Sequence, residues 1–221
     1  MDERALPFLH HWYTSSSAPG GAGTAPGSPS GALPVPILTT ARLVLRDWRD
    51  DDLPAFRALN ADAEVMRFFP SPLSADESDA MAGRVRAHLS REGFGFWAVS
   101  PAGSTEFLGM VGLLRVPFVA AFTPAVEVGW RLQQSAWGQG FATEAARAAV
   151  AFGFTALGLR ELVSFTVPAN EPSRRVMTKL GFHRDEAGDF LHPRLPEGHP
   201  LQRHVLYRLS YEAWAAGRKV P

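Results

Sequence analysis

A glycine-rich turn between a strand-like run and a long apolar segment most constrains how this chain of 221 residues can fold. Residues 125–132 alternate like a strand, residues 137–141 read Trp-Gly-Gln-Gly-Phe, and residues 141–159 are rich in Ala and Phe. This order predicts a strand, a tight turn and a helix. The first turn of such a helix has N–H groups without intrahelical partners and a partial positive charge. Gly138 and Gly140 have no Cβ, so a ligand could approach the main chain closely.

The turn is therefore predicted to bind a phosphate or pyrophosphate group. A purely structural turn is the alternative. Two common phosphate-binding loops do not fit the sequence. The chain has no Gly-x-x-x-x-Gly-Lys-Ser/Thr segment. The three-glycine spacing of dinucleotide-binding loops is also missing, because Thr143 stands where the third glycine or alanine is required.

Three further segments accompany the turn in a fixed order. Glu127-Val-Gly-Trp precedes it, and Asn170-Glu-Pro-Ser and Lys179-Leu-Gly-Phe follow it. Together the four segments resemble the GCN5-related N-acetyltransferase (GNAT) superfamily and, within it, the RimJ/RimL-like ribosomal-protein-alanine N-acetyltransferases. The resemblance covers roughly residues 39–210. It implies acetyl-CoA as the donor co-substrate, no metal, and a primary amine as the acceptor, either a protein N-terminal α-amine or a small amine.

Composition restricts the binding partners and the cellular location that can be expected for this chain. Lys plus Arg equals Asp plus Glu at 22 each, so no global basic field is present to recruit nucleic acid. The chain has no Cys, which excludes disulfides, thiolate metal sites and a cysteine nucleophile. No apolar run approaches the length of a membrane span, and the first residues do not resemble a signal peptide. A cytoplasmic protein is expected, as a monomer or a homodimer.

The N-terminal segment differs from the rest of the chain. Residues 14–36 are almost wholly Ser, Gly, Ala, Thr and Pro, which bury too little apolar area to offset the entropy cost of ordering. Residues 1–37 are therefore predicted to form a flexible extension, and residues 38–217 an acetyltransferase domain. Hydrophobic periodicity predicts the order βααβββαβαββ in this domain. That is an α/β fold with a mixed, mostly antiparallel seven-stranded sheet and about four helices, as the resemblance also implies.

Two helices have recognisable start signals. The acidic run at residues 50–52 is expected to cap a first helix, with Pro54 in its first turn. Ser74 and Glu77 match a capping box and predict a longer helix that ends near residue 91.

Glu127 is the candidate general base. An amine is mostly protonated at neutral pH, so acetyl transfer to it requires a proton acceptor. Strand alternation places Glu127 on the opposite face from Val126 and Val128, and partial burial would raise the pKa of its carboxyl group. The resemblance implies the same role. The alternative is a solvated glutamate on an edge strand.

The resemblance also implies how the donor is held. The glycine turn would bind the pyrophosphate, the preceding strand would pair with the pantetheine amides, and Asn170 would contact the cofactor arm. A helix-initiating residue is the alternative for Asn170. The expected cofactor-binding residues are Val128, Trp130, Trp137, Gly138, Gln139, Gly140, Phe141, Ala142, Asn170 and Ser173.

The candidate general acid differs from the one found in many members of the superfamily. Many members have a tyrosine seven residues after the asparagine, where this chain has Met177, which cannot donate a proton. Resemblance to the RimJ/RimL-like group suggests that Ser173 hydrogen-bonds or protonates the leaving thiolate. The alternative is that Ser173 caps a helix. The missing tyrosine also leaves open a non-catalytic acyl-CoA-binding module.

Two segments are expected near the acceptor. Phe68 and Phe69 either border the acceptor site, as the resemblance implies, or pack in the core. Residues 189–204 contain three His and three Pro, and His192 and His199 are the candidate substrate contacts. An inert surface loop is the alternative. The histidine spacing fits no standard zinc pattern, so no metal site is predicted.

Overall fold

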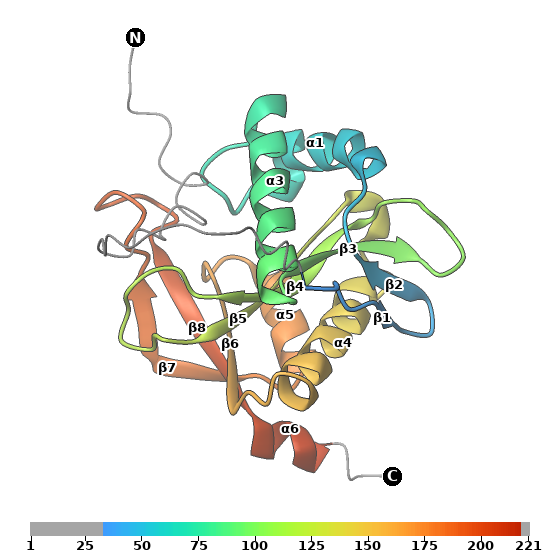
Figure 1. Cartoon of the computed structure of the whole chain (residues 1–221). Coiled ribbons are helices and arrows are strands. Elements are labelled where there is room, and N and C mark those ends of the chain that lie inside the picture. The colour runs from blue at the N-terminus through green and yellow to red at the C-terminus, as the bar shows by residue number, and fades with distance from the viewer. Residues whose placement is uncertain (1–32, 218–221) are drawn as a thin grey trace, which may run out of the picture.

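The computed structural model describes residues 33–217, which form an α/β fold around one mixed sheet (Figure 1). The sheet has eight strands in the order β1-β2-β3-β4-β5-β6-β8-β7. The strands are β1 Leu38–Thr39, β2 Leu43–Arg46, β3 Phe96–Pro101, β4 Gly109–Arg115, β5 Val126–Leu132, β6 Glu161–Thr166, β7 His183–Leu191 and β8 Arg203–Ser210. The α-helices are α1 Leu53–Ala61, α2 Ala63–Met66, α3 Ala75–Glu92, α4 Phe141–Thr155, α5 Glu171–Lys179 and α6 Tyr211–Gly217.

The fold class is as predicted, and the strand count differs by one. The sequence predicts a single strand near residues 38–48, whereas the structure has the hairpin β1–β2. Thr40 makes the turn: its N–H donates to Leu43 O over 2.9 Å, and its Oγ1 accepts from Leu43 N over 2.9 Å. The side-chain hydroxyl thus stabilises a reversal that strand alternation does not reveal.

The sheet is antiparallel except at its centre. β5 and β6 run parallel and pair at one register position, Glu127 with Val163. β4 pairs with β5 along its whole length on the other side. β5 is therefore a central strand, and the edge-strand alternative for Glu127 is wrong. Beyond Glu127, β5 and β6 separate.

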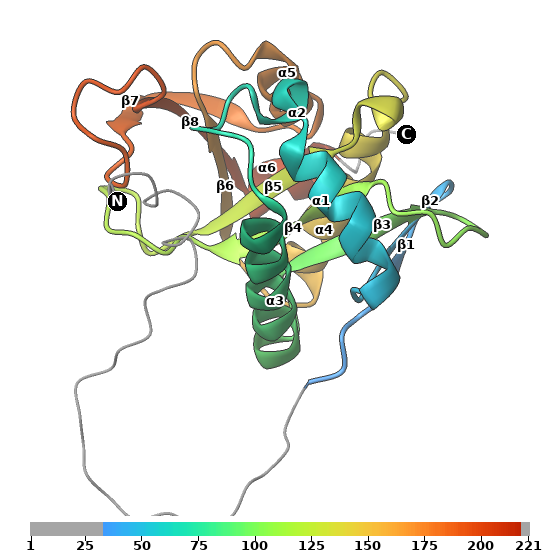
Figure 2. The same ribbon diagram turned by 90° about the horizontal axis from the view of Figure 1, so that it is seen from above.

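Helices cover both faces of the sheet (Figure 2). On one face, Trp97 of β3 packs edge-on against Phe152 of α4, with ring centroids 5.5 Å apart. On the other face, Arg131 of β5 contacts Asn60 of α1. Leu43 and Leu45 are fully buried, as their alternation predicts.

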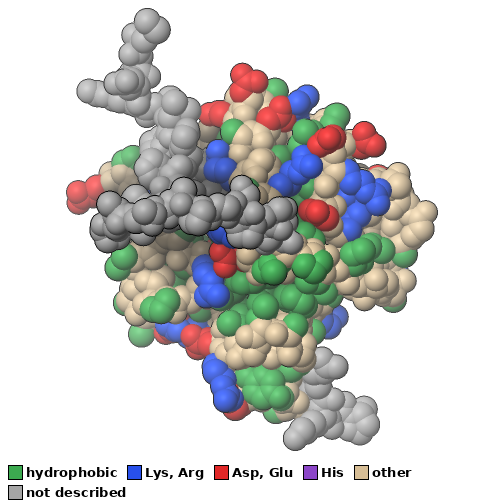
Figure 3. Space-filling model, in the orientation of Figure 1, with side chains coloured by type: hydrophobic (Ala, Val, Ile, Leu, Met, Phe, Trp, Pro, Cys, Tyr) green, Lys and Arg blue, Asp and Glu red, His purple; other side chains and the backbone are tan. Residues whose placement is uncertain are grey.

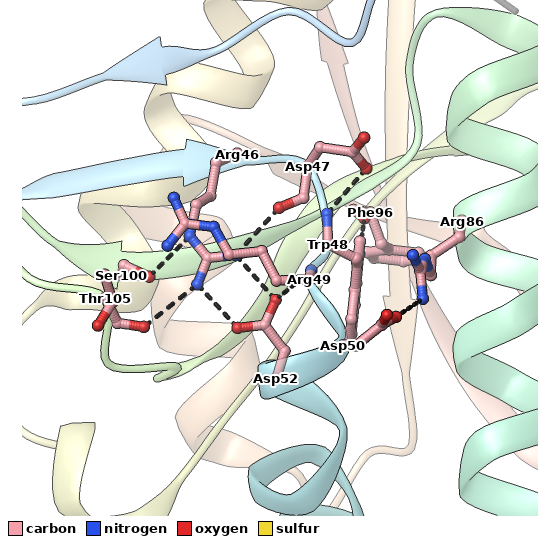
Figure 4. A network of polar contacts seen from close by, with 10 residues as sticks. All are labelled: Arg46, Asp47, Trp48, Arg49, Asp50, Asp52, Arg86, Phe96, Ser100 and Thr105. Atoms are coloured by element: carbon pink, nitrogen blue, oxygen red, sulfur yellow. Dashed lines mark hydrogen bonds and ion pairs between the residues drawn. The ribbon is translucent and has the colours of Figure 1, made fainter.

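The acidic run caps the 3-10 turn Asp50–Asp52, where Asp52 Oδ2 accepts from Arg49 N over 2.7 Å, but it does not cap α1 itself. Asp52 stands at the N-cap of α1, but its side chain makes no capping hydrogen bond. Its carboxylate instead accepts from both terminal nitrogens of Arg46, each over 2.8 Å, and both residues are buried (Figure 4). Arg46 also donates to Ser100 Oγ over 3.1 Å. The carboxylate is occupied by a buried cation from the sheet, and this ion pair fixes α1 against β2 and β3.

The capping box of α3 is confirmed. Ser74 Oγ accepts from Glu77 N over 3.2 Å, and Glu77 Oε2 accepts from Ser74 N over 2.7 Å. The helix ends at Gly93, which has a left-handed φ of 71°.

Part of the expected extension lies against the domain. Leu33 N donates to Ser90 O over 2.9 Å, and Trp97 Nε1 donates to Pro36 O over 2.8 Å. The rest of the expected extension, residues 1–32, lies outside the described residues. Acidic and basic side chains are intermixed on the face shown in Figure 3. No helix within the described part of the chain is long and apolar enough to cross a bilayer.

Candidate functional site

A cavity of about 530 Å³ lies where β5 and β6 separate. Its walls come from β5, β6, the starts of α4 and α5, the segment after α2 and the segment before β8. The carboxyl ends of diverging parallel strands are a common place for ligands in α/β folds. The sequence elements that resemble the acetyltransferases therefore meet around one hollow.

The glycine turn forms one end of this cavity. Gly138 and Gly140 have left-handed φ values of 74° and 80°, and Gly140 is the N-cap of α4. No side chain caps α4, whereas Ser74 caps α3. A Cβ on Gly138 would have no atom within 4 Å, so the approach to the backbone is open. The first-turn N–H groups of α4 can bind an anion such as a pyrophosphate.

Side chains of the same motif hold the turn in place. Trp137 lines the cavity and its Nε1 donates to Leu132 O over 2.9 Å. Gln139 does not line the cavity, and its Nε2 donates to Ser135 O over 2.7 Å. Glu144 accepts from Thr40 Oγ1 over 2.6 Å and from Arg42 Nε over 2.7 Å, which ties α4 to the β1–β2 hairpin. Gln139 and Glu144 therefore stabilise the turn and the helix.

Glu127 lies on β5 at the point where the strands part. It is 5% exposed and lines the cavity. Its buried Oε2 has no hydrogen-bond partner within residues 33–217. Burial raises the pKa of this carboxyl group well above its ordinary value. A carboxylate at this position is an unusually strong proton acceptor.

The start of α5 supplies Asn170 and Ser173 to the cavity wall. Asn170 is the N-cap: its Oδ1 accepts from Ser173 N over 3.2 Å, and its Nδ2 donates to Thr166 Oγ1 over 3.0 Å. The predicted capping role of Ser173 is therefore wrong, since Asn170 is the cap. This frees the Ser173 hydroxyl from that role. Met177, at the tyrosine position of other superfamily members, is 1% exposed.

Aromatic and histidine side chains form another part of the cavity wall. Phe68, Phe69, His192 and His204 all line the cavity. The rings of His192 and His204 have centroids 5.0 Å apart. His199 is not among the lining residues, and its Nδ1 accepts from Leu201 N over 3.1 Å within the loop.

Both cavity histidines are uncharged at neutral pH. Burial lowers the pKa of His192 to about 3 and that of His204 to about 4. His204 Nδ1 lies 3.1 Å from Gln202 O and therefore carries the proton of the neutral ring. Among residues 33–217, no group of three or more His, Cys, Asp and Glu side chains is arranged to hold a metal ion.

Sequence reasoning missed several lining residues. Arg131 and Phe165 line the cavity, and so do Phe96 and Thr166. The sequence could have indicated Arg131, because it stands four residues after Glu127 on the same strand and therefore on the same face. Phe165 had none, since its position depends on the pairing of β6 with β8.

Comparisons with known proteins identify the family. The family model described as "Acetyltransferase (GNAT) domain" matches residues 42–183. "Uncharacterized N-acetyltransferase YoaA" from Bacillus subtilis is 31% identical over 68% of this chain and 84% of its own length. "FsC-acetyl coenzyme A-N(2)-transacetylase" from Aspergillus fumigatus is 32% identical over 83% of this chain and 80% of its own length.

Solved structures agree with this assignment. An acetyltransferase from Agrobacterium tumefaciens superposes with a TM-score of 0.64 at 27% identity, covering 83% of this chain and 99% of that one. RimJ from Mycobacterium smegmatis, in complex with CoA-disulfide, has a TM-score of 0.61 at 22% identity, covering 80% and 90%. At that identity the second likeness supports the fold alone. The chain belongs to the GNAT family and is an acetyl-CoA-dependent acetyltransferase.

Proposed function

We propose that this enzyme transfers the acetyl group of acetyl-CoA to a primary amine, with Glu127 as the general base. The observation that carries the proposal is the buried Glu127 carboxyl group in the cavity, with its Oε2 unpartnered among the described residues. An ammonium group that enters the cavity would meet a carboxylate with a raised affinity for its proton. The name of the Aspergillus relative specifies acetylation at a nitrogen, which also supports an amine acceptor.

The reaction balances with the groups in the cavity. Glu127 takes a proton from the ammonium, and the free amine attacks the thioester carbonyl. The C–N bond forms, the C–S bond breaks, and the remaining extra proton on nitrogen passes to the thiolate. Ser173, on the cavity wall, would donate a hydrogen bond to that sulfur. Glu127 then releases its proton to solvent.

The donor would be held by the glycine turn and by Asn170. The first-turn N–H groups after Gly140 would bind the pyrophosphate, and the edge of β5 that is not paired with β6 would face the pantetheine arm. A neighbouring hollow of about 390 Å³ is lined by the Arg42–Glu144 ion pair and by Arg147 and Lys179, and the last two would add positive charge beside the phosphates.

A second candidate is an acyl-CoA-binding module without turnover. Met177 favours it, because a buried thioether replaces the tyrosine that protonates the thiolate in many relatives. It predicts acetyl-CoA binding with no product from any amine.

A thiol-release assay with acetyl-CoA distinguishes these functions. The acceptors should include amino acids, polyamines and peptides with free N-termini. Release that depends on one acceptor class supports acetyl transfer and shows whether the target is a protein N-terminus or a small amine. Tight acetyl-CoA binding without release across the whole panel would contradict it. Monomer or homodimer, and a cytoplasmic location, remain predictions.

A further inference from the structure

Arg131 is a buried cation in the cavity wall with only neutral contacts. It is 7% exposed. Its Nη1 donates to Asn60 Oδ1 over 2.5 Å and lies 3.9 Å from Met81 Sδ, and its guanidinium lies 4.1 Å from the centre of the Phe69 ring. Within residues 33–217 no carboxylate pairs with it, and its buried Nε has no acceptor. A buried charge without a counter-charge is costly, so a feature outside the fold must account for it.

Other arginines in this protein show the usual arrangement. Arg46 is equally buried at 6% exposed, and Asp52 accepts two hydrogen bonds from it (Figure 4). Arg67 and Arg175 also line the cavity, but both are exposed and pair with Glu64 and Glu171, each over 3.2 Å. Arg46, Arg67 and Arg175 thus each have a carboxylate partner, and Arg131 differs from them. Arg194 is only half-buried, and Pro117 O accepts a hydrogen bond from its Nη2.

Arg131 and Glu127 lie on the same face of β5 and line the same cavity. They are four residues apart, so their Cα atoms are about 13 Å apart. The residue between them on that face is Gly129, and the Phe96 ring fills the space over it, with Phe96 Cζ 3.0 Å from the position of a Cβ there. Glu127 Oε1 lies 3.9 Å from the same position, so the carboxyl group extends toward Gly129. A ligand whose amine meets Glu127 would therefore reach the guanidinium through the shared cavity, beside the Phe96 ring.

The β6 side of the cavity is aromatic and uncharged. Phe165, His192 and His204 line the cavity there. Val163 pairs with Glu127 in the parallel direction, and Phe165 follows two residues later on the same face. Arg131 and these aromatic side chains therefore lie in the same direction from Glu127, the cation on the β5 side of the cavity and the aromatic rings on the β6 side.

We propose that the acceptor carries a carboxylate beside its amine, and that Arg131 binds this carboxylate. The planar fork of a guanidinium matches a carboxylate, and the bond neutralises the buried charge. The acceptor class is then an amino acid with an apolar side chain directed to Phe165, His192 and His204. This inference rests on the proposed acetyl transfer to an amine and selects a small acceptor over a protein N-terminus.

The first test uses the unmodified enzyme and matched amines. Phenylalanine, phenylalaninamide and phenethylamine share one apolar group, and leucine, leucinamide and isopentylamine form a second series. A hydrogen bond to a charged group predicts kcat/KM about 10- to 100-fold higher for each amino acid than for its amide or amine. Equal values within a series, or a preference for peptides with free N-termini over free amino acids, would overturn the inference.

The second test removes the guanidinium. Arg131→Gln should lower kcat/KM for the amino acid to the value for its uncharged analogue and leave the analogue nearly unchanged. Arg131→Lys should retain part of the preference, because it keeps the charge without the fork. Arg86→Gln removes an arginine that lies outside the cavity and pairs with Asp50 over 2.7 Å, so it should retain the full preference. Acetyl-CoA affinity, measured by calorimetry, should be the same in all four proteins.

The outcomes separate the two proposals. If Arg131→Gln lowers the rate equally for charged and uncharged acceptors, Arg131 only supports the fold and the inference is wrong. If no amine is turned over, the proposed function is wrong. The binding of phenylalanine and leucine to the enzyme–CoA complex, measured by calorimetry, then tests the role of Arg131 separately. If the wild type binds these amino acids and Arg131→Gln does not, the inference is supported. If the wild type and Arg131→Gln behave identically, the inference is wrong.

Discussion

The Glu127 side chain is 5% exposed, and its Oε2 has no partner within the described chain. A residue chosen only for stability at this central position of β5 would be apolar, because burial of an unpaired carboxylate costs free energy. The same burial gives the carboxylate its affinity for a proton. Proton transfer at this position requires a carboxylate, whereas stability would favour an apolar residue.

Replacing Glu127 by glutamine tests the catalytic part. Glu127→Gln keeps the size of the side chain and removes its basicity. Because a general base typically contributes about 10²–10⁴-fold, we expect kcat to fall by that factor while acetyl-CoA affinity is unchanged. Steady-state kinetics and calorimetry measure the two quantities. A variant with wild-type kcat, where chemistry is shown to limit the rate, would remove Glu127 from the mechanism.

The pH dependence of stability tests the same residue independently. The folded protein holds the Glu127 proton more tightly than the unfolded chain does, since burial raises its pKa. Below the unfolded pKa of about 4.3 the group is protonated in both states, and the free energy of unfolding is not reduced by its burial as a charge. As the pH rises toward the folded pKa, the free energy of unfolding decreases.

Glu127→Gln should therefore gain stability relative to the wild type as pH rises from about 4.3. Thermal melting of both proteins across this range gives the difference. Glu106→Gln, which makes the same substitution at an exposed glutamate, is the matched control. A constant difference between Glu127→Gln and the wild type would contradict the burial argument.

At the level of elements, the start of α4 differs from the starts of α3 and α5. α3 and α5 have side-chain caps, whereas α4 begins at the uncapped Gly140 beside the cavity. A helix whose first N–H groups lack a cap can offer them to a phosphate. The start of α4 is therefore the end proposed to bind the phosphates, whereas Asn170 at the start of α5 is a cap that also lines the cavity.

Gly138→Val tests the uncapped end, and Gly103→Val is its control. Gly138 and Gly103 have φ values of 74° and 77°, and a Cβ on either would have no atom within 4 Å. A left-handed backbone costs a residue with a side chain roughly 1–2 kcal/mol, so both variants should lose similar stability. Only Gly138→Val should weaken acetyl-CoA, by about 10- to 100-fold if one hydrogen bond to a charged group is lost. Equal affinity in the two variants would contradict the loop assignment.

The two capped ends offer a second matched pair. Asn170 Oδ1 accepts from Ser173 N over 3.2 Å, and Ser74 Oγ accepts from Glu77 N over 3.2 Å. Asn170→Ala and Ser74→Ala should each reduce the free energy of unfolding by about 1 kcal/mol. Asn170→Ala should also raise the KM for acetyl-CoA, because Asn170 lines the cavity and Ser74 does not. If both variants keep wild-type kinetics, Asn170 is only a cap.

At the scale of the whole molecule, the cavity divides the sheet. Strands β1 to β5 lie on one side of it and β6 to β8 on the other, and β5 and β6 pair at one register position. A donor bound in this gap contacts both parts of the sheet. Binding should therefore stabilise the native state as a unit.

Acetyl-CoA should raise the free energy of unfolding by about 2.7 kcal/mol when its concentration is 100 times Kd. Thermal denaturation measures the increase, and hydrogen exchange should slow in both β5 and β6. The Gly138→Val protein should show a smaller increase at the same concentration. An unchanged melting temperature at concentrations that saturate the wild type would contradict a site in the gap.

The sequence by itself determined the features that depend on near neighbours along the chain. The α3 capping box of Ser74 and Glu77, the glycine turn before α4 and the alternation of Leu43 and Leu45 all form as predicted. Their physical causes lie within a few residues: a hydroxyl that reaches a nearby N–H, a backbone without Cβ, and a period of two. These local signals are sufficient to predict the α/β fold class and the glycine turn before α4.

Only the tertiary structure decided which of the candidate side chains meet. Asp52 binds Arg46 instead of capping α1, because the sheet brings a buried cation to it. His192 lines the cavity and His199 does not, although both lie in one proline-rich loop. The full burial of Glu127 and the lone charge of Arg131 depend on β4, β6 and α1, which are distant in sequence. Burial and pairing are set by neighbours across the fold, and they decide the chemistry of this site.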